Sequence, residues 1–307
     1  MKWKQYSVLT AGTYVDEVAE IFHRMGSGGV IIEDPFANDD FTGSEEWDST
    51  AFTFLDYEKR EFVLIKAYFP MDWNQADQLA QSIAEVEKRH HIECEIVLDE
   101  VDDEDWAHSW KEFFHTFKVG DRLVIRPKWE RYQPQDGEVV VLIDPGMAFG
   151  TGAHASTRFC LQFLERYIQG GEKVLDAGCG SGILSLAAAR LGAADILALD
   201  LDPLAVEAAR ENARDNGLEG QIKVLEGNVL DINEQPQDII LANLTADMLI
   251  NLLPVAAKNL RPQGYLFASG ILDYRWPEVK QELEKYGLNT IEVLTEADWV
   301  GVAARKK

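Results

Sequence analysis

The chain has 307 residues with 29 basic and 53 acidic side chains, and its formal net charge of −24 is unfavourable for binding nucleic acid, which depends on Lys and Arg. This length suffices for two domains with separate hydrophobic cores. The sequence has no apolar run of eighteen residues and no signal-peptide pattern, so we expect no membrane partner. Cys94, Cys160 and Cys179 do not have the spacing typical of disulfides. We therefore expect a cytoplasmic protein with reduced thiols.

The first third of the chain is predicted to form a small α+β domain. Its apolar periodicity indicates strands and helices in the order β-α-β-β-α-β, at residues 3–9, 14–26, 29–35, 61–69, 74–91 and 92–101. This order is typical of a ferredoxin-like fold, so we assign residues 1–103 to a ferredoxin-like domain. The polar stretch 36–50 is predicted to be a mobile loop.

The negative charge is concentrated in this domain. Residues 1–105 hold 8 basic and 25 acidic side chains, a net charge of −17. Such acidity either improves solubility or steers a basic partner toward the surface. Under the second interpretation, residues 1–103 form a substrate-recognition domain.

Aromatic residues mark the next segment. Trp106, Trp110, Phe113, Phe114 and Phe117 recur at helical spacings, which predicts a linker helix over 104–120 with one apolar face. Strands are expected at 121–129 and 138–146. The second domain is assigned to residues 121–307.

The loop "DPGMAFGTGAHAST", residues 144–157, is rich in glycine. It lacks the lysine of a phosphate loop, and His154 has no companion at metal-ligand spacing, so no metal site is predicted. A hydrogen bond that braces the loop is the expected role of His154, and a hinged flap is the interpretation that remains for the loop. The following helix, 156–168, is predicted to be capped by Ser156 or Thr157.

From Lys173 onward, apolar strands alternate with amphipathic helices, which predicts an α/β domain with a parallel sheet and helices on both faces. The last segment, 289–306, is typical of two strands joined by a turn. We therefore expect a Rossmann-like sheet that ends in an antiparallel hairpin.

The segment "VLDAGCGSG" joins the first strand of this sheet to its helix. Gly178, Gly180 and Gly182 allow a sharp turn and a close approach of a ligand to the sheet edge. Asp176 precedes them, and Ile183 stands where a dinucleotide fingerprint needs its third glycine, so a ligand without a pyrophosphate is favoured.

Two further strand ends carry candidate residues. Asp200 ends the second strand, 22 residues after Gly178, where a carboxylate can bind a ribose diol or can simply be a solvated acid. The solvated-acid interpretation applies better to Asp202, which is followed by Pro203 at an expected helix start. Asn243 ends the fourth strand, where it either faces the reactive end of a ligand or caps a helix.

These motifs carry a resemblance to a known family. "LDAGCGSG", "ALDLD" and "ANLTAD" resemble motifs of class I S-adenosylmethionine-dependent methyltransferases. Together with "DPGMAFGTGAHAST" and "EDWAHSWKEFFHTFKVGDRLVIRPKWE", they resemble the ribosomal large-subunit protein eleven methyltransferase family along essentially the whole chain. One departure is "NLTA", where the family more commonly has N-I-L-A.

The resemblance implies a cofactor, a substrate and site residues. The cofactor would be S-adenosylmethionine, contacted by Thr157, Gly178, Asp200 and Asn243, with Phe149 of the flap folded over it and Asp176, Gly180 and Gly182 completing the glycine loop. The substrate would be a basic ribosomal large-subunit protein, methylated on lysine or N-terminal amines. We expect a monomer.

The expected chemistry is attack of an amine lone pair on a sulfonium methyl group. The Asn243 side-chain oxygen and the Leu244 carbonyl are the candidate acceptors that orient the amine, and Thr245 either assists or caps the next helix. Two alternatives share the cofactor motifs: a small-molecule amine methyltransferase and a non-catalytic cofactor-binding module.

Overall fold

The computed structural model describes residues 2–27, 30–33, 62–102, 114–144, 150–231 and 236–307. The chain divides into two compact units, Met1–Phe113 and Phe114–Lys307, so the boundary falls within the predicted linker. Most of the predicted linker helix lies outside the described residues. Its last part is not helical, because Phe117–Val119 form strand β5, paired with the strand that follows.

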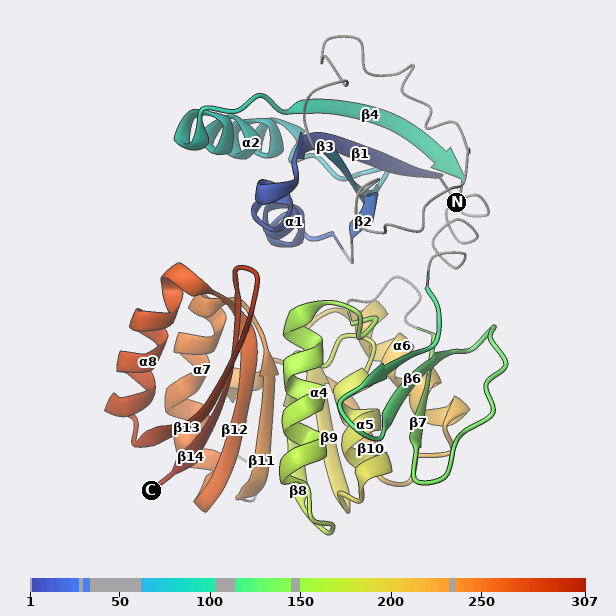
Figure 1. Ribbon diagram of the computed structural model, residues 1–307, viewed down its shortest axis with the longest axis vertical. Coiled ribbons are helices and arrows are strands. Elements are labelled where there is room, and N and C mark those ends of the chain that lie inside the picture. Colours follow the sequence, from blue (N-terminus) through green and yellow to red (C-terminus); the bar gives the residue numbers. More distant parts are fainter. Residues whose placement is uncertain (1, 28–29, 34–61, 103–113, 145–149, 232–235) are drawn as a thin grey trace. The chain divides into compact units, whose positions relative to one another are not determined.

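The first unit is a four-stranded antiparallel sheet with two helices (Figure 1). Its elements are β1 (Lys2–Ala11), α1 (Val15–Arg24), β2 (Val30–Glu33), β3 (Phe62–Pro70), α2 (Ala76–His90) and β4 (Glu95–Asp102). The strand order is β2-β3-β1-β4, and the order along the chain is the predicted β-α-β-β-α-β. The ferredoxin-like assignment itself stays a prediction, and the loop at 36–50 lies outside the described residues.

The core of this unit lies between the sheet and its two helices. Phe22 of α1 and Ile83 of α2 are buried against Val8, Ile65 and Phe69 of the sheet. Burial of these apolar side chains on one face of each helix explains why the amphipathic pattern predicted both helices.

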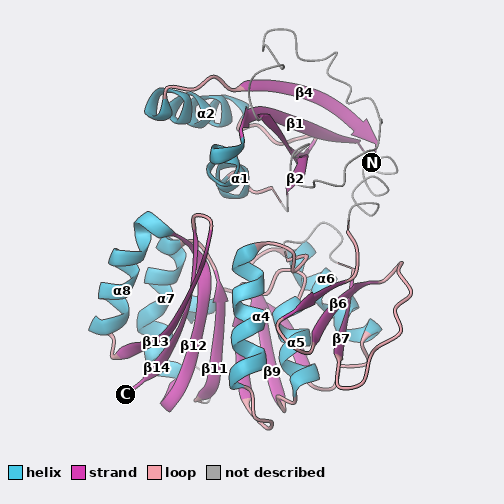
Figure 2. Cartoon of the chain, viewed as in Figure 1, coloured by secondary structure: helices cyan, strands magenta, loops and turns pink. Residues whose placement is uncertain are grey.

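The second unit contains a seven-stranded sheet in the order β10-β9-β8-β11-β12-β14-β13 (Figure 2). Its elements after β5 are β6 (Leu123–Pro127), β7 (Val139–Ile143), α4 (Ala155–Tyr167), β8 (Lys173–Ala177), α5 (Ile183–Leu191), β9 (Asp195–Asp200), α6 (Pro203–Asp215), β10 (Ile222–Glu226), β11 (Gln237–Asn243), α7 (Ala246–Asn259), β12 (Leu260–Leu272), α8 (Trp276–Lys285), β13 (Leu288–Glu296) and β14 (Trp299–Lys306). Strand β14 is antiparallel to both of its neighbours, and the other pairs are parallel. The predicted parallel sheet with a terminal hairpin is thus confirmed.

Helices cover both faces of this sheet, with α4, α5 and α6 on one face and α7 and α8 on the other (Figure 1). The strand order reverses between β8 and β11, since β8 is followed by β9 on one side and β11 lies on the other. In open α/β sheets, ligands bind outside the carboxyl ends of the strands at such a point. The sheet topology therefore locates the site at the ends of β8, β9 and β11.

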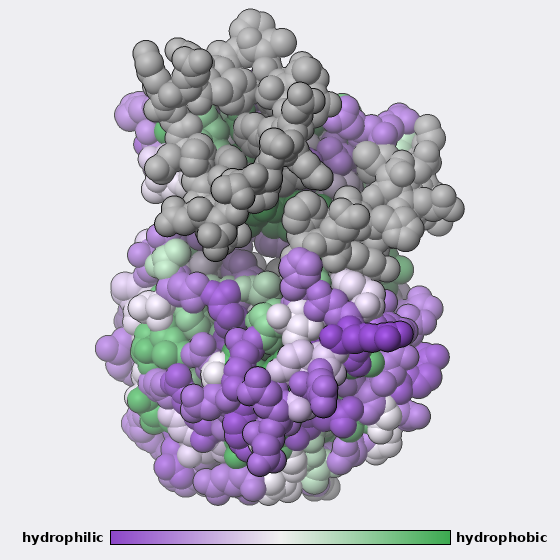
Figure 3. Space-filling model, turned by 45° about the vertical axis from the view of Figure 1, so that its right-hand side comes forward, coloured by the Kyte–Doolittle hydropathy of each residue, from purple (hydrophilic) through white to green (hydrophobic). Residues whose placement is uncertain are grey.

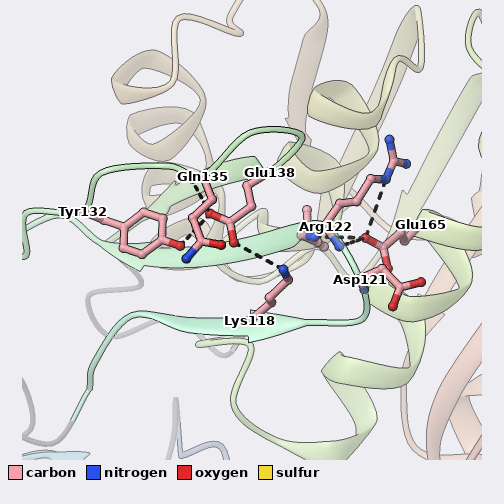
Figure 4. Close-up of polar contacts among 8 residues, drawn as sticks. Lys118, Asp121, Arg122, Tyr132, Gln135, Glu138 and Glu165 are labelled. Atoms are coloured by element: carbon pink, nitrogen blue, oxygen red, sulfur yellow. Dashed lines mark hydrogen bonds and ion pairs between the residues drawn. The ribbon is translucent and has the colours of Figure 1, made fainter.

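A small sheet, β5-β6-β7, holds the C-terminal end of α4 (Figure 4). The Glu165 carboxylate of α4 accepts hydrogen bonds from the backbone N–H groups of Asp121, Arg122 and Leu123, at 2.8, 2.6 and 3.0 Å. On the same sheet, Glu138 accepts hydrogen bonds from the Tyr132 hydroxyl and the Gln135 N–H. The Glu165 contacts fix α4, whose N-terminal turn carries Thr157.

Hydrophilic residues predominate on the visible face of the second unit, with smaller apolar areas among them (Figure 3). None of the helices in the described part of the chain is both long and apolar enough to cross a membrane. All three cysteines are free thiols.

Candidate active site

The glycine loop between β8 and α5 turns sharply over the sheet edge. Gly178 and Gly182 have φ values of 75° and 81°, in the left-handed region that favours glycine. A Cβ at Gly178 would lie 2.7 Å from Leu244 Cδ2, and one at Gly182 would lie 3.1 Å from the Ala209 Cβ. A side chain at either position would be strained by the positive φ and would also push on the Leu244 side chain or on Ala209, so glycine is favoured at both.

Asp176, at the end of β8, is completely buried. Its Oδ2 accepts hydrogen bonds from the Ser185 hydroxyl, at 2.6 Å, and the Ser185 N–H, at 3.1 Å. Its Oδ1 has no partner among the described residues. Burial, partly opposed by the Ser185 hydrogen bonds, raises the pKa of Asp176 to about 6. A buried acceptor without a partner is what a ligand with a donor or cationic group would complete.

Asp200, at the end of β9, is connected to the glycine loop. Its Oδ2 accepts a hydrogen bond from Gly180 N–H at 2.9 Å, and its Oδ1 accepts one from Asp202 N–H at 3.0 Å. A carboxylate offers about four lone-pair sites, so further acceptor capacity remains for a diol. Helix α6 begins at Pro203, as predicted, and Asp202 is its cap rather than only a solvated acid, because its Oδ1 accepts a hydrogen bond from Leu204 N–H.

Asn243 and Thr157 are brought together from positions 86 residues apart. The Asn243 Nδ2 donates a hydrogen bond to the Thr157 hydroxyl at 3.2 Å. Thr157 is buried in the first turn of α4, while Asn243 is half-buried at the carboxyl end of β11. The amide nitrogen is therefore engaged and the side-chain oxygen points elsewhere, toward Gly270, where an added Cβ would lie 3.2 Å from it.

The two residues after Asn243 complete this edge. Leu244 N–H donates a hydrogen bond to the Ser269 carbonyl at 3.0 Å, and the Leu244 side chain covers Gly178. Thr245 is at the N-cap of α7, yet its hydroxyl makes no capping hydrogen bond, contrary to the capping role considered for it. The main-chain oxygen of Thr245 accepts the hydrogen bond from Leu249 N–H.

His154, rather than Ser156 or Thr157, caps helix α4. Its Nδ1 accepts a hydrogen bond from Ser156 N–H at 3.3 Å and contacts the Ser156 hydroxyl at 2.8 Å, which corrects the predicted cap. Burial lowers the pKa of His154 to about 4, so the ring is neutral near pH 7. The expected loop-bracing hydrogen bond is thus observed. Phe149, the predicted flap residue, lies outside the described residues.

A buried asparagine on α6, which was not predicted from the sequence, joins the glycine loop to the end of β7. The Asn212 side chain accepts a hydrogen bond from Asp144 N–H and donates to the carbonyls of Asp144 and Ser181, each at 2.9 Å. Ser181 in turn donates its hydroxyl hydrogen to the Gly150 carbonyl at 2.6 Å. Asn212 lies on the buried face of α6, and a polar residue within an apolar stripe was the available signal.

Cys179 of the glycine loop is a packing residue, as predicted. It is buried, and burial raises the pKa of its thiol far above the usual range, so the neutral form persists near pH 7. A neutral thiol is a poor nucleophile.

The site thus combines a glycine backbone turn, a strand-end carboxylate and a strand-end amide at the point where the strand order reverses. The model of the family "Ribosomal protein L11 methyltransferase (PrmA)" matches residues 2–307. The chain belongs to this family.

Named members of the family are similar over their whole length. Proteins named ribosomal protein L11 methyltransferase from Syntrophomonas wolfei and Caldanaerobacter subterraneus are 52% and 40% identical to the chain, and in both cases 100% of each chain is covered. A solved structure titled ribosomal protein L11 methylase, from Lactobacillus delbrueckii subsp. bulgaricus, is 32% identical with a TM-score of 0.57 and covers 63% of this chain and 100% of its own. The predictions of a class I methyltransferase fold and of a methyltransferase are confirmed.

The site residues fit the cofactor that this family membership supports, S-adenosylmethionine. The glycine loop would lie against it, Asp200 would accept hydrogen bonds from its ribose, and the unpartnered Asp176 Oδ1 would face a cationic or donor group. When bound, this cofactor supplies an electrophilic methyl group. These residue roles stay predictions.

Cofactor binding is expected to release a proton from Asp176 below about pH 6. In the ligand-free protein, Asp176 is protonated below its pKa of about 6. A cationic group at Oδ1 would favour the carboxylate and lower that pKa. Affinity should therefore fall as the pH falls from about 6, approaching tenfold per pH unit. Calorimetry in buffers of different ionisation enthalpy measures the released proton.

Asp176→Asn is the matched control, because its amide oxygen still accepts the two Ser185 hydrogen bonds. This variant should bind the cofactor more weakly and release no proton. The same proton release from Asp176→Asn, or none from the parent, would contradict the assignment of Oδ1 to a cationic group.

Proposed function

We propose that this protein transfers methyl groups from S-adenosylmethionine to amino groups of ribosomal protein L11, on lysine side chains, on the N-terminal amine or on both. The observation that carries this proposal is the arrangement of the Asn243 side chain. Its amide nitrogen donates a hydrogen bond to the Thr157 hydroxyl, so the amide oxygen of Asn243 remains as an acceptor beside the Leu244 carbonyl. Family membership over residues 2–307 supports the substrate.

The amine must be neutral to attack. A lysine with a pKa of about 10.4 is mostly protonated at pH 7, and neutralising it costs roughly 4 to 5 kcal/mol, whereas an α-amine near 8 costs about 1 kcal/mol. The oxygens of Asn243 and Leu244 can each accept an N–H of the amine. Two such hydrogen bonds direct the lone pair toward the methyl group, which is the orientation that the transfer needs.

The finer features of substrate recognition also belong to this proposal. The acidic unit that contains residues 1–103 would bind a basic surface of the substrate protein, because its net charge of −17 over residues 1–105 attracts cations. We propose in addition that the enzyme acts in the cytoplasm as a monomer and binds no nucleic acid directly. Its acidity supports the last point.

Mass spectrometry of the ribosomal protein after incubation with enzyme and S-adenosylmethionine tests the proposal. The expected result is a mass increase of one CH₂ unit per methyl group at amine positions, because each transfer replaces an N–H hydrogen by a methyl group. An unmodified ribosomal protein would contradict the substrate, while methylation of small amines alone would favour the small-molecule alternative. Cofactor binding without methyl release would favour the non-catalytic alternative.

Removing the first unit should separate cofactor binding from substrate recognition. A fragment of residues 114–307 contains the glycine loop, Asp200 and Asn243 within one compact unit, so it is expected to bind S-adenosylmethionine. It should methylate the ribosomal protein poorly, and the activity of the full chain should fall as salt screens the acidic surface. A cooperative thermal unfolding transition first establishes that the fragment is folded. The rates of methyl transfer by the fragment and by the full chain are then compared. Full-length rates from the fragment would contradict a recognition role.

A further inference from the structure

Strand β12 is irregular next to the end of β11. Its pairing with β14 shifts register between Ala268 and Ile271, which lie opposite Val302 and Val300. Two residues of β12, Ser269 and Gly270, therefore oppose one residue of β14, which is the arrangement of a β-bulge. On its other side β12 pairs with β11 without a register shift from Ile239 to Asn243, and Ser269 is the partner of Asn243.

The bulge is anchored to both neighbouring segments. The Ser269 carbonyl accepts the hydrogen bond from Leu244 N–H at 3.0 Å, and the buried Ser269 hydroxyl donates to the Val300 carbonyl at 3.2 Å. These two hydrogen bonds connect the β11–α7 junction to β14 through one residue of β12.

Gly270 packs closely against both candidate acceptors, which only a residue without a side chain allows. Its φ of 82° is in the left-handed region, and a Cβ there would lie 2.5 Å from the Leu244 carbonyl oxygen and 3.2 Å from the Asn243 Oδ1. Since the first distance is shorter than real Cβ atoms show, a side chain at 270 would displace the Leu244 carbonyl. The close contact with Gly270 therefore helps to fix the position of the Leu244 carbonyl, and the Asn243 oxygen lies next to it.

We propose that the Ser269–Gly270 bulge is a positioning element for methyl transfer, which sets the Leu244 carbonyl and the Asn243 side-chain oxygen where the target amine needs its two acceptors. The bulge acts through these two oxygens. Among the described residues, its hydrogen bonds and close approaches are to Leu244, Asn243 and Val300, not to the glycine loop or to Asp200. The inference rests on the proposed function, and it adds two residues to the site that neither the motifs nor the family name indicated.

Gly270→Ala tests the proposal, with Gly287→Ala as its matched control. Gly287 also has a left-handed φ, of 73°, but nothing lies within 4 Å of an added Cβ, so its substitution introduces backbone strain alone. Gly270→Ala should lower kcat at least about tenfold with the Kd for S-adenosylmethionine changed less than about threefold, because the misplaced acceptors matter mainly in the transfer step. Gly287→Ala should keep the parent kcat although its Tm falls.

A double-mutant cycle separates positioning from general damage. If the bulge acts through the two oxygens, Gly270→Ala should cost less in an Asn243→Ala background than in the parent, since one of the two acceptors is already lost. Independent, additive losses would overturn the proposal.

Ser269→Ala keeps the test decisive if Gly270→Ala does not fold. It removes only the hydrogen bond to Val300, and kcat should fall a few fold with cofactor affinity retained. Parent-like kcat in every folded bulge variant overturns the inference while the proposed function stands. A parent protein that transfers no methyl to ribosomal protein L11 overturns the proposed function and the inference with it.

Discussion

Replacing Asp200 with alanine is expected to weaken S-adenosylmethionine binding at least about tenfold, because a charge-assisted hydrogen bond contributes about 1.5 to 3 kcal/mol and tenfold in affinity corresponds to about 1.4 kcal/mol. The carboxylate lies at the end of β9 and accepts hydrogen bonds from Gly180 and Asp202 N–H groups. Its loss would remove the ribose acceptors and the hydrogen bond to Gly180, while Gly178 and Cys179 N–H would still donate to the Leu199 carbonyl of β9. Calorimetric titration with the cofactor measures the affinity.

Two further variants, at positions 200 and 202, show whether the ribose contact or the hydrogen bond to the glycine loop accounts for most of the lost affinity. Asp200→Asn retains one oxygen that can accept from Gly180 N–H, so it should lose less affinity than alanine. Asp202→Ala removes the cap of α6, which costs about 1 kcal/mol of stability, yet it should leave cofactor affinity unchanged. An Asp200→Ala variant that binds as tightly as the parent would exclude the ribose role.

Much of the second unit could be predicted from the sequence, because its signals are local. Alternating apolar strands and amphipathic helices indicate a parallel sheet, and such a sheet places strand ends at one edge. Gly178, Asp200 and Asn243 each end or follow a strand, so their common location was predictable from topology alone. The structure confirms that β8, β9 and β11 are these strands, in the order β9-β8-β11.

The contacts that arrange the site could not be predicted in the same way, because they join distant segments. Neither periodicity nor spacing indicates that Asn243 meets Thr157, or that Asn212 holds Asp144 to the glycine loop. The bulge at Ser269 could not be predicted from the sequence either, because a single extra residue in a strand leaves the apolar pattern nearly unchanged. The predicted cap of α4 was wrong, because His154 caps this helix in place of a serine or threonine, the residues that usually do so.

Asn243→Ala is expected to lower the turnover number about ten- to a thousandfold, the range for a hydrogen bond used mainly in the transition state. Cofactor affinity should change little, because the hydrogen bond of the Asn243 side chain goes to Thr157 and its oxygen lies beside Gly270, whereas Asp200 is the residue hydrogen-bonded to the glycine loop. Single-turnover methyl transfer to the ribosomal protein, with the variant confirmed as folded and cofactor-loaded, measures the chemical step.

The pH dependence of the Asn243→Ala rate then distinguishes the two ways in which an acceptor can help. If raising the pH toward the pKa of the amine restores the rate, Asn243 mainly favours the neutral amine, whose protonated form dominates at pH 7. A deficit that persists at high pH assigns it to orienting the lone pair. Thr157→Val, which keeps the shape but removes the hydroxyl that engages Asn243 Nδ2, should show a smaller loss of the same kind. Because a residue that only ends a strand would leave methyl transfer untouched, parent-like turnover by Asn243→Ala would remove Asn243 from the chemical step.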